Sequence, residues 1–364
     1  MRDLRSAFAA DYREAREKFS AAAAARNLAV EPHVHPSARG IAGEELSIDV
    51  AVAGDIEDNA LLVVSSAMHG VEGFCGSGCQ VALLQDDDVQ AALARRGVAL
   101  AVVHAVNPHG FSHLRRTNED NVDLNRNFRN FRVPPAPNAD YARMHAVLVP
   151  SVWPPTRENS ETLGAEVARH GVTALQALIS RGQSEFPDGL FYAGRAPAWS
   201  NTVLRGVFAR HGRGRTQLGW IDIHTGLGAW GLGEKIHFGP DDATMIARAR
   251  AWYGGDVTTV YDGTSSSAEL TGDAHDVVRD ACPNAQYTGI VLEFGTRGLN
   301  DILQALRADQ WLANHPDAGA AAHAGIRRQM RHAFHDDSPT WQAMAYAQVR
   351  VAVLQALRGL GTGT

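Results

Sequence analysis

The stretch LLVVSSAMHGVEG, residues 61–73, contains the pattern on which the whole fold prediction depends. Its apolar run at 61–64 is typical of a buried strand, and it ends in small and polar residues. Three further runs have the same form: VALAVVHAV at 98–106, the segment around WIDI at 220–223, and GIVLEF at 289–294. Each of these predicted strands also leads into polar residues at its C-terminal end.

Helical patterns separate the apolar runs, for example at residues 77–95 and 241–253. This alternation predicts an α/β fold in which helices cover both faces of a mixed, mostly parallel sheet. In open α/β sheets, ligands bind beyond the carboxyl ends of the strands. We therefore expect the four polar segments to meet at one site.

The regions outside this alternation predict a single catalytic domain with two additions. Residues 1–40 are predicted to be an N-terminal helical extension to a domain that spans 41–364. Several prolines at 129–158 predict a long surface loop. This loop begins a predicted insertion at about 129–200. The Gly, Pro and aromatic-rich stretch at 182–201 either covers a pocket or packs as a structural loop.

The composition is that of an ordinary globular protein of 364 residues, with 45% hydrophobic and 20% charged residues. A formal net charge of −6 argues against a nucleic-acid binder, which needs clustered Lys and Arg. The sequence has no run of 18 apolar residues, so we expect no membrane span. The odd number of cysteines and the charged N-terminal region, which lacks the core of a signal peptide, predict a cytoplasmic protein.

His69 and Glu72 lie three residues apart in HGVEG, between glycines that permit a tight turn. In such a turn both side chains can reach one ion, and zinc takes an imidazole nitrogen and a carboxylate oxygen readily. The pair alone is a weak signal in a chain with 16 histidines. His224, at the end of a predicted strand, is the candidate third ligand. Asp222 projects to the same side of that strand and either supports the site or binds backbone.

Glu293 lies at the end of the apolar strand in VLEFGT. A charged residue there costs several kcal/mol unless it has a partner or a function. A general base has such a function, because it takes a proton from an attacking water whose pKa a metal ion lowers, and delivers it to the leaving nitrogen. The structural alternative is an ion-paired carboxylate at a strand end.

The segment RRTNEDNVDLNRNF, residues 115–128, is the most specific signal in the sequence. It concentrates guanidinium and amide groups on Arg115, Arg116, Asn118, Asn121, Asn125, Arg126 and Asn127. A solvated loop can have this composition. Beside candidate zinc ligands, however, it suits an anionic substrate, because arginine can bind a carboxylate through two parallel hydrogen bonds.

With these motifs assembled, the sequence resembles the zinc carboxypeptidase superfamily, the carboxypeptidase-A-like metallopeptidases. Within it, the chain looks most similar to a bacterial branch with the HGVEGFCGSG and NEDNVDLNRNF signatures. The resemblance covers roughly residues 45–310. The His-x-x-Glu pair, the DLNRNF block, the later His and the late Glu occur in the order that is found in the superfamily. The resemblance implies a zinc-carboxypeptidase-like fold.

The resemblance also implies a role for each candidate residue around the metal. His69, Glu72 and His224 would bind one zinc ion. Glu293 would be the general base and acid. Asp123 matches an aspartate that orients the first zinc histidine, as partners of metal-binding histidines usually do.

The same resemblance implies how a substrate is held. Asn125 and Arg126 match the pair that binds the terminal carboxylate. An arginine shortly before them would stabilise the oxyanion, and Arg116 fits the spacing slightly better than Arg115, although both stay open.

The digestive members of the superfamily place a tyrosine over the carboxylate pocket. In this chain no tyrosine has a spacing to Glu293 that matches it, and Tyr261 and Tyr287 are only candidates. The acidic loop at 261–276 either lines the side-chain pocket or is solvated.

The sequence therefore predicts a metallohydrolase that cleaves an amide bond next to a carboxylate. The first hypothesis is a metallocarboxypeptidase acting on a peptide or small-molecule substrate with a free carboxylate. The alternative is an N-acyl-amino-acid deacylase related to aspartoacylase and succinylglutamate desuccinylase. A non-catalytic protein that recognises carboxylate ends through a zinc site is the second alternative, although Glu293 argues against it. We expect no nucleic-acid or membrane partner, and the oligomeric state stays open.

Overall fold

The structure, a computed structural model, describes residues 4–54 and 59–361. Within these ranges the strands form one seven-stranded mixed sheet in the order β1-β2-β4-β3-β5-β7-β6. The four central strands are parallel, namely β4 (Val98–His104), β3 (Ala60–Ser66), β5 (Gln217–Trp230) and β7 (Gln286–Gly295). The remaining strands pair antiparallel, namely β1 (Val30–Arg39), β2 (Glu45–Ala53) and β6 (Gly233–His237). The predicted α/β class and all four predicted strands are confirmed.

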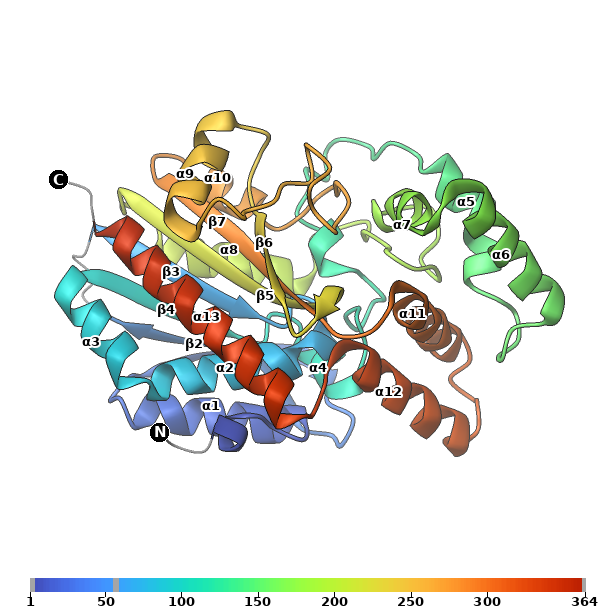
Figure 1. The fold of residues 1–364 in the computed structure, drawn as a ribbon. Coiled ribbons are helices and arrows are strands. Elements are labelled where there is room, and N and C mark those ends of the chain that lie inside the picture. The colour runs from blue at the N-terminus through green and yellow to red at the C-terminus, as the bar shows by residue number, and fades with distance from the viewer. Residues whose placement is uncertain (1–3, 55–58, 362–364) are drawn as a thin grey trace.

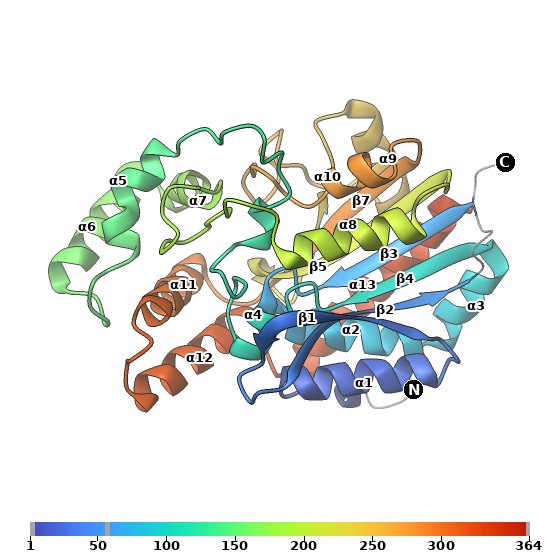
Figure 2. The same ribbon diagram turned by 180° about the vertical axis from the view of Figure 1, so that it is seen from behind.

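Helices cover both faces of the sheet, as Figures 1 and 2 show from opposite sides. One face carries α1 (Tyr12–Ala24), α2 (Gly73–Gln85), α3 (Asp87–Arg96), α9 (Ala243–Tyr253) and α13 (Pro339–Leu360). The other face carries α8 (Trp199–His211) and α10 (Asp276–Ala281). No helix within the described ranges combines the length and apolar character that a membrane crossing requires.

The central strands are apolar throughout because both of their faces are buried. In β3, Leu62 and Val64 pack into the core beneath α2 and α13, whereas Leu61 and Val63 pack into the core beneath α8. All four side chains are at most 1% exposed. This two-sided burial explains why the run is continuous rather than alternating.

A separate group of helices lies beyond the carboxyl ends of the parallel strands, at the right of Figure 1. It consists of α5 (Ala139–Leu148), α6 (Arg157–His170), α7 (Val172–Ser180), α11 (Leu299–Asn314) and α12 (Ala320–Phe334). The buried Arg307 of α11 donates hydrogen bonds to the carbonyl oxygens of Val147 and Leu148 at the end of α5. It thereby ties the C-terminal helices to the predicted insertion.

The prediction of a long surface loop at 129–158 is wrong for the middle of this range, where the chain forms α5. The Asn138 side chain accepts a hydrogen bond from Tyr141 N and caps the helix. Tyr141, Met144 and Leu148 follow at helical spacing and are buried. The flanking prolines lie outside Ala139–Leu148, so they do not interrupt its hydrogen bonds.

The predicted helical extension over residues 1–40 is helical only in η1 (Leu4–Ala7) and α1. Residues 30–39 form β1, an edge strand that pairs with β2. Its sequence, VEPHVHPSAR, contains two prolines, which an edge strand tolerates because one of its sides makes no ladder hydrogen bonds. The helix α1 packs against α2 and buries Phe19 in the core beneath the sheet.

Candidate active site

The carboxyl ends of the parallel strands border a cavity of about 280 Å³. His69 follows β3, and Arg116 lies in the segment after β4. His224 in β5 and Glu293 in β7 are opposite each other in the strand register. All four residues line the cavity, so the predicted convergence of four distant segments is confirmed.

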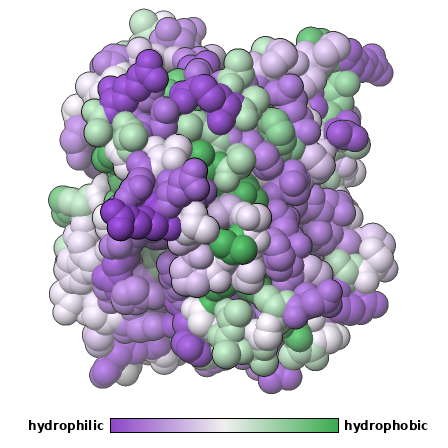
Figure 3. Space-filling view, turned by 90° about the vertical axis from the view of Figure 1, so that its right-hand side faces the viewer, coloured by the Kyte–Doolittle hydropathy of each residue, from purple (hydrophilic) through white to green (hydrophobic). Residues whose placement is uncertain are grey.

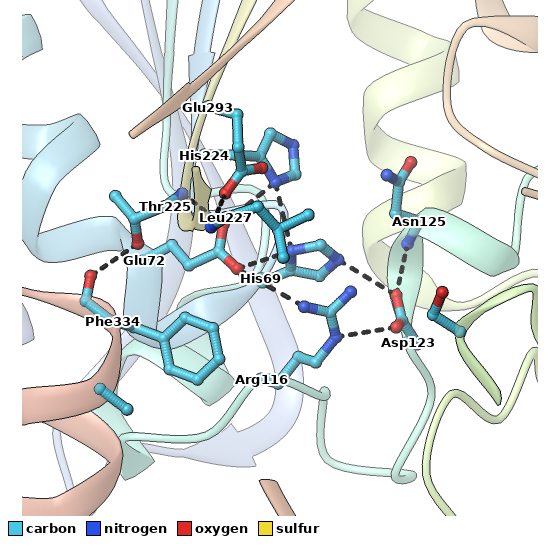
Figure 4. A network of polar contacts seen from close by, with 12 residues as sticks. His69, Glu72, Arg116, Asp123, Asn125, His224, Thr225, Leu227, Glu293 and Phe334 are labelled. Atoms are coloured by element: carbon cyan, nitrogen blue, oxygen red, sulfur yellow. Dashed lines mark hydrogen bonds and ion pairs between the residues drawn. The ribbon is translucent and has the colours of Figure 1, made fainter. Parts of the chain in front are cut away.

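His69, Glu72 and His224 form a buried cluster in which the three side chains point at one another (Figure 4). His69 Nδ1 lies 2.8 Å from Glu72 Oε1, and His224 Nδ1 lies 3.0 Å from Glu72 Oε2. The two Nδ1 atoms are 3.2 Å apart. Two nitrogens that both bind one tetrahedral zinc at ~2 Å lie about 3.3 Å apart. The three side chains therefore have the spacing that a single metal ion requires.

A carboxylate lies behind each imidazole. His69 Nε2 is 3.3 Å from Asp123 Oδ1, and His224 Nε2 is 2.7 Å from Asp222 Oδ2. A ring that gives its Nε2 hydrogen to a carboxylate keeps the Nδ1 lone pair for a metal. A hydrogen bond to Asp222 holds the His224 ring in this orientation, and Asp123 lies at ion-pair distance from His69 Nε2, so the donor set fits a borderline metal such as zinc.

Asp222 is itself part of a buried chain of hydrogen bonds. Its Oδ1 accepts a hydrogen bond of 2.6 Å from Ser65 Oγ, which accepts another of 2.6 Å from Trp220 Nε1. This chain, Trp220–Ser65–Asp222–His224, runs between the neighbouring strands β3 and β5. Of the two interpretations of Asp222 from the sequence, the structure supports contact with the candidate metal site. No sequence motif identified Ser65 or Trp220.

Glu72 and His224 are charged in the absence of a metal ion. Burial disfavours ionisation of Glu72, but the two neighbouring histidines hold its pKa well below the usual range. Burial disfavours the charged form of His224, but Asp222 and Glu72 raise its pKa well above the usual value. A metal cation would therefore replace a proton on His224, as metal binding to histidine generally does.

Gly70, two residues before Glu72, lies where two backbone segments approach each other too closely for a side chain. The turn that carries Glu72 is the short helix η2 (Gly70–Glu72). A Cβ on Gly70 would lie 2.0 Å from the carbonyl carbon of Gly110. Gly70 N also donates a hydrogen bond to Arg116 O. The contact between these backbones, rather than an unusual turn conformation, places Arg116 next to the candidate ligands.

Glu293 is 7% exposed and faces the same cavity. Its Oε1 accepts a hydrogen bond of 3.0 Å from Leu227 N. Among the described residues, no cationic side chain lies within ion-pair distance of its carboxylate. The alternative hypothesis of an ion-paired carboxylate at a strand end therefore does not describe Glu293. Burial and the nearby charge of Glu72 raise the pKa of Glu293 to about 8. An acidic group with a pKa near neutrality is suited to exchanging protons.

Asn125 and Arg126 line the cavity beside the candidate metal ligands. Arg126 donates from Nε and Nη2 to Ser180 O and from Nη1 to Asn125 O. These contacts use three of its five N–H groups. Burial lowers the pKa of Arg126 to about 10, so it stays charged at neutral pH. The Asn125 side-chain oxygen accepts from Ala274 N, which leaves the amide nitrogen as a donor.

Of the two adjacent arginines, Arg116 borders the cavity and Arg115 does not. Arg116 Nε donates to Asp123 Oδ2 at 2.9 Å. Burial disfavours ionisation of Asp123, but Arg116 holds its pKa well below the usual range. Arg115 is held elsewhere, because its Nε bonds Asp309 and its Nη2 bonds Asn121. The geometry thus places Arg116 rather than Arg115 beside the cavity, a choice that the sequence alone left open.

The other asparagines of the 115–128 segment organise a loop rather than face the cavity. Asn121 Nδ2 donates to the carbonyl oxygens of Pro187 and Gly189. Asn127 Nδ2 donates to those of Ala193 and Ala196. Much of the donor concentration in this segment therefore fixes residues 181–198, and only part of it is available to an anion.

Helices and loops outside the sheet form the walls of the cavity. The apolar wall consists of residues from α7 and α11, namely Leu175, Ile179, Ile302, Leu303 and Leu306. The polar wall comes from the 261–276 loop, namely Tyr261, Ser267, Glu269 and Asp273. Of the two candidate tyrosines, Tyr261 lines the cavity and Tyr287 does not. Figure 3 views the helical end of the molecule, which is largely hydrophilic with hydrophobic residues near its centre.

Solved structures with a similar fold are carboxypeptidase-like. Thrombin activatable fibrinolysis inhibitor is 11% identical with a TM-score of 0.54, and the match covers 97% of this chain and 75% of that chain. The bovine protein, in complex with tick carboxypeptidase inhibitor, is 11% identical with a TM-score of 0.51, and 97% of each chain is covered. Carboxypeptidase A from Helicoverpa armigera is 14% identical with a TM-score of 0.45, and the match covers 92% of this chain and 77% of that chain. The chain has the carboxypeptidase-like fold that the sequence resemblance implied.

Comparison with curated proteins found no match to the sequence. A family model described as "Protein of unknown function (DUF2817)" matches residues 8–348. This match extends from the end of η1 to within α13 and includes every strand and every candidate site residue. The chain belongs to the DUF2817 family.

Proposed function

We propose that the protein is a zinc-dependent hydrolase that cleaves an amide bond next to a carboxylate, as a metallocarboxypeptidase of peptides or small peptide-like substrates. The observation that carries the proposal is the pair of imidazole Nδ1 atoms 3.2 Å apart beside Glu72. The same cavity holds Glu293 and two guanidinium groups. The bovine structure with a similar fold is bound to a carboxypeptidase inhibitor, which is consistent with this activity.

In the proposed mechanism, His69, Glu72 and His224 would hold the zinc ion. When bound, the ion would polarise the scissile carbonyl and lower the pKa of the attacking water. Glu293 removes a proton from this water and delivers it to the leaving nitrogen. Its raised pKa suits both steps, because the carboxyl group must accept and then release the proton near neutral pH.

Three residues hold the substrate in this proposal. Asn125 and the two remaining N–H groups of Arg126 bind the carboxylate, in a buried site where charge-assisted hydrogen bonds are strong. Arg116 stabilises the negative charge that develops on the carbonyl oxygen. Its Nη1 lies 3.6 Å from Glu72 Oε1, so the guanidinium is already beside the candidate metal site before a substrate binds.

An N-acyl-amino-acid deacylase is a second candidate, and the size of the cavity favours it. The volume of about 280 Å³ lies at the small end of ligand pockets, which are roughly 300–1,000 Å³. Residues of α7 and α11 form one wall, which limits the length of a bound chain. A single acylated amino acid fits this space more readily than an extended peptide.

Metal analysis of protein purified without added ions, followed by two substrate panels, tests the proposal. The first panel contains acylated dipeptides and the second acylated amino acids, each with a carboxamide analogue as control. Cleavage of the first panel supports a carboxypeptidase, and cleavage of only the second supports a deacylase. If zinc-loaded protein and the Glu293→Gln variant both leave every compound intact, the outcome favours the second alternative, a site that binds carboxylate ends without cleaving them.

We expect Asp222→Asn to weaken zinc binding by about 10- to 100-fold, which is the usual effect of losing an outer partner of a metal histidine. The change removes the carboxylate that orients His224. Titration against a chromophoric chelator measures the affinity. Ser65→Ala gives a smaller loss, because Asp222 keeps its charge. The matched control is Ser66→Ala, whose hydroxyl bonds Gln80 instead. Equal affinities for Asp222→Asn and the wild type contradict this role.

We expect Arg116→Gln to lower kcat by about 10²- to 10³-fold while zinc stays bound, as for the loss of one oxyanion donor. Arg115→Gln is the matched control, because the neighbouring arginine does not border the cavity. It keeps kcat but lowers the unfolding free energy by roughly 3 kcal/mol, since it removes one partner of a buried ion pair with Asp309. Steady-state kinetics measures kcat and thermal unfolding measures stability, and the opposite assignment of the oxyanion group would reverse the two effects on kcat.

A further inference from the structure

Phe191 has a backbone conformation that is rare for its residue type. It lies in the segment between α7 and α8 with φ at +55°. Within residues 4–54 and 59–361 it is the one aromatic residue with a positive φ. A bulky side chain disfavours this region of backbone space. Such conformations tend to occur at functional sites, where the surrounding structure imposes them.

Hydrogen bonds on both sides of Phe191 hold this backbone in place. Gln183 N donates to Phe191 O at 3.1 Å, and Asp123 N donates to Tyr192 O at 2.8 Å. Asn121 Nδ2 reaches Gly189 O at 3.1 Å. Two of these three anchors belong to the segment that also carries Arg116 and Arg126. The segment therefore fixes Phe191 relative to the cavity rather than leaving it on a free loop.

The Phe191 ring is shared by two guanidinium groups. Arg116 Cζ lies 5.4 Å and Arg126 Cζ lies 5.7 Å from the ring centroid. Both distances are within the range of about 6 Å for an attractive cation–π contact. The ring is 6% exposed and lines the cavity. It therefore offsets part of the repulsion between two like charges without satisfying their hydrogen-bond donors.

We propose that Phe191 is a positioning residue that orients Arg126 for the carboxylate of a ligand while its ring also contacts Arg116. The inference rests on the proposed function for the class of ligand, an organic carboxylate. It deepens that function by assigning the predicted insertion at 129–200 a part in recognition. The unfavourable backbone of Phe191 is retained because it brings an aromatic face to both guanidiniums.

Binding of two small probes to the zinc-loaded full chain tests this role. The probes are 3-phenylpropanoate and 3-phenylpropanamide, which differ in the carboxylate alone. We expect Phe191→Leu to raise the Kd of the propanoate about tenfold and to change that of the amide less than about twofold, because cation–π contacts are lost while an apolar side chain is kept. Phe191→Tyr, which keeps the aromatic face, restores the wild-type Kd.

Phe186→Leu is the matched control. Phe186 lies in the same segment, but its ring packs on those of Tyr141 and His145 instead of an arginine. We expect this variant to bind both probes like the wild type. Thermal unfolding of each variant shows whether it is folded. If Phe191→Leu fails to fold, the variants Phe191→Tyr and Phe191→Trp, which both keep an aromatic ring, replace it. A loss of propanoate affinity in both of them overturns the proposal.

Other outcomes separate this inference from the proposed function. Equal propanoate affinity in Phe191→Leu and wild type, an equal loss for both probes, or wild-type protein that does not prefer the carboxylate overturns the inference. If the wild type cleaves amides, Phe191→Leu should raise KM about tenfold, because Arg126 binds the substrate carboxylate in the proposed function. If the wild type cleaves nothing and the propanoate still depends on Phe191, the proposed function fails and the inference stands.

Discussion

The His224→Ala variant is expected to bind no zinc and to cleave no amide above background. The imidazole is one of three buried groups whose ligand atoms lie within 4.8 Å of one another, and two ligands cannot complete the usual three-residue set. The affinity loss should exceed the roughly 100-fold that removal of an outer partner costs. Metal content of the purified variant and its rate on the best substrate measure the two effects.

His237→Ala is the matched control for this variant. His237 is another buried histidine that lines the same cavity, but its Nε2 contacts Pro240 O and it lies outside the three-residue cluster. This variant should keep one zinc per chain. Because His224→Ala leaves the carboxylate of Asp222 without its partner, its folding is checked by thermal unfolding. A folded His224→Ala protein with full zinc content would contradict the assignment of the ligands.

The second large effect is expected for Glu293→Gln, which keeps the shape of the side chain and removes the base. Proton transfer by a positioned side chain contributes about 10²- to 10⁴-fold, so kcat should fall by this factor. Zinc content should stay at one per chain, because Glu293 is not in the ligand cluster. Glu269→Gln is the matched control, since that carboxylate also lines the cavity but is exposed.

The pH dependence of Glu293 gives the same prediction a second test. Burial and the charge of Glu72 raise its pKa to about 8. A zinc ion on Glu72 would offset that charge and move the pKa of Glu293 below 8. A base must be deprotonated, so kcat/KM should rise with pH up to this pKa. Glu293→Gln should lose this rising limb, and a variant that keeps it would show that another group is the base.

The sequence was sufficient to predict the centre of the sheet and the candidate ligands. Buried parallel strands are apolar on both faces, so Leu61–Val64 stands out as a continuous run. The carboxyl ends of such strands meet, which brings His69 and His224 together although they are 155 residues apart. The edge strand β1 gave no such signal, because half of its pairing surface is solvated and its side chains mix polar and apolar types.

Other features of the site depend on contacts that no local pattern contains. Arg115 and Arg116 are adjacent and chemically identical, and the choice between them depends on Asp309, which is 194 positions further along the chain. The hydrogen bond from Trp220 to Ser65 joins two strands and has no sequence spacing of its own. The positive φ of Phe191 arises from anchors on both sides of it, whereas its residue type predicts the opposite.

The strands and the surrounding helices contribute different kinds of residues to the cavity. Strand ends and the segments that follow them carry the reactive groups, whereas Leu175 and Leu303 belong to helices α7 and α11 outside the sheet. Under the proposed function, selectivity and reactivity would therefore reside in different elements. Laboratory evolution confined to those two helices is then expected to change which compounds bind while the candidate metal ligands and Glu293 stay in place.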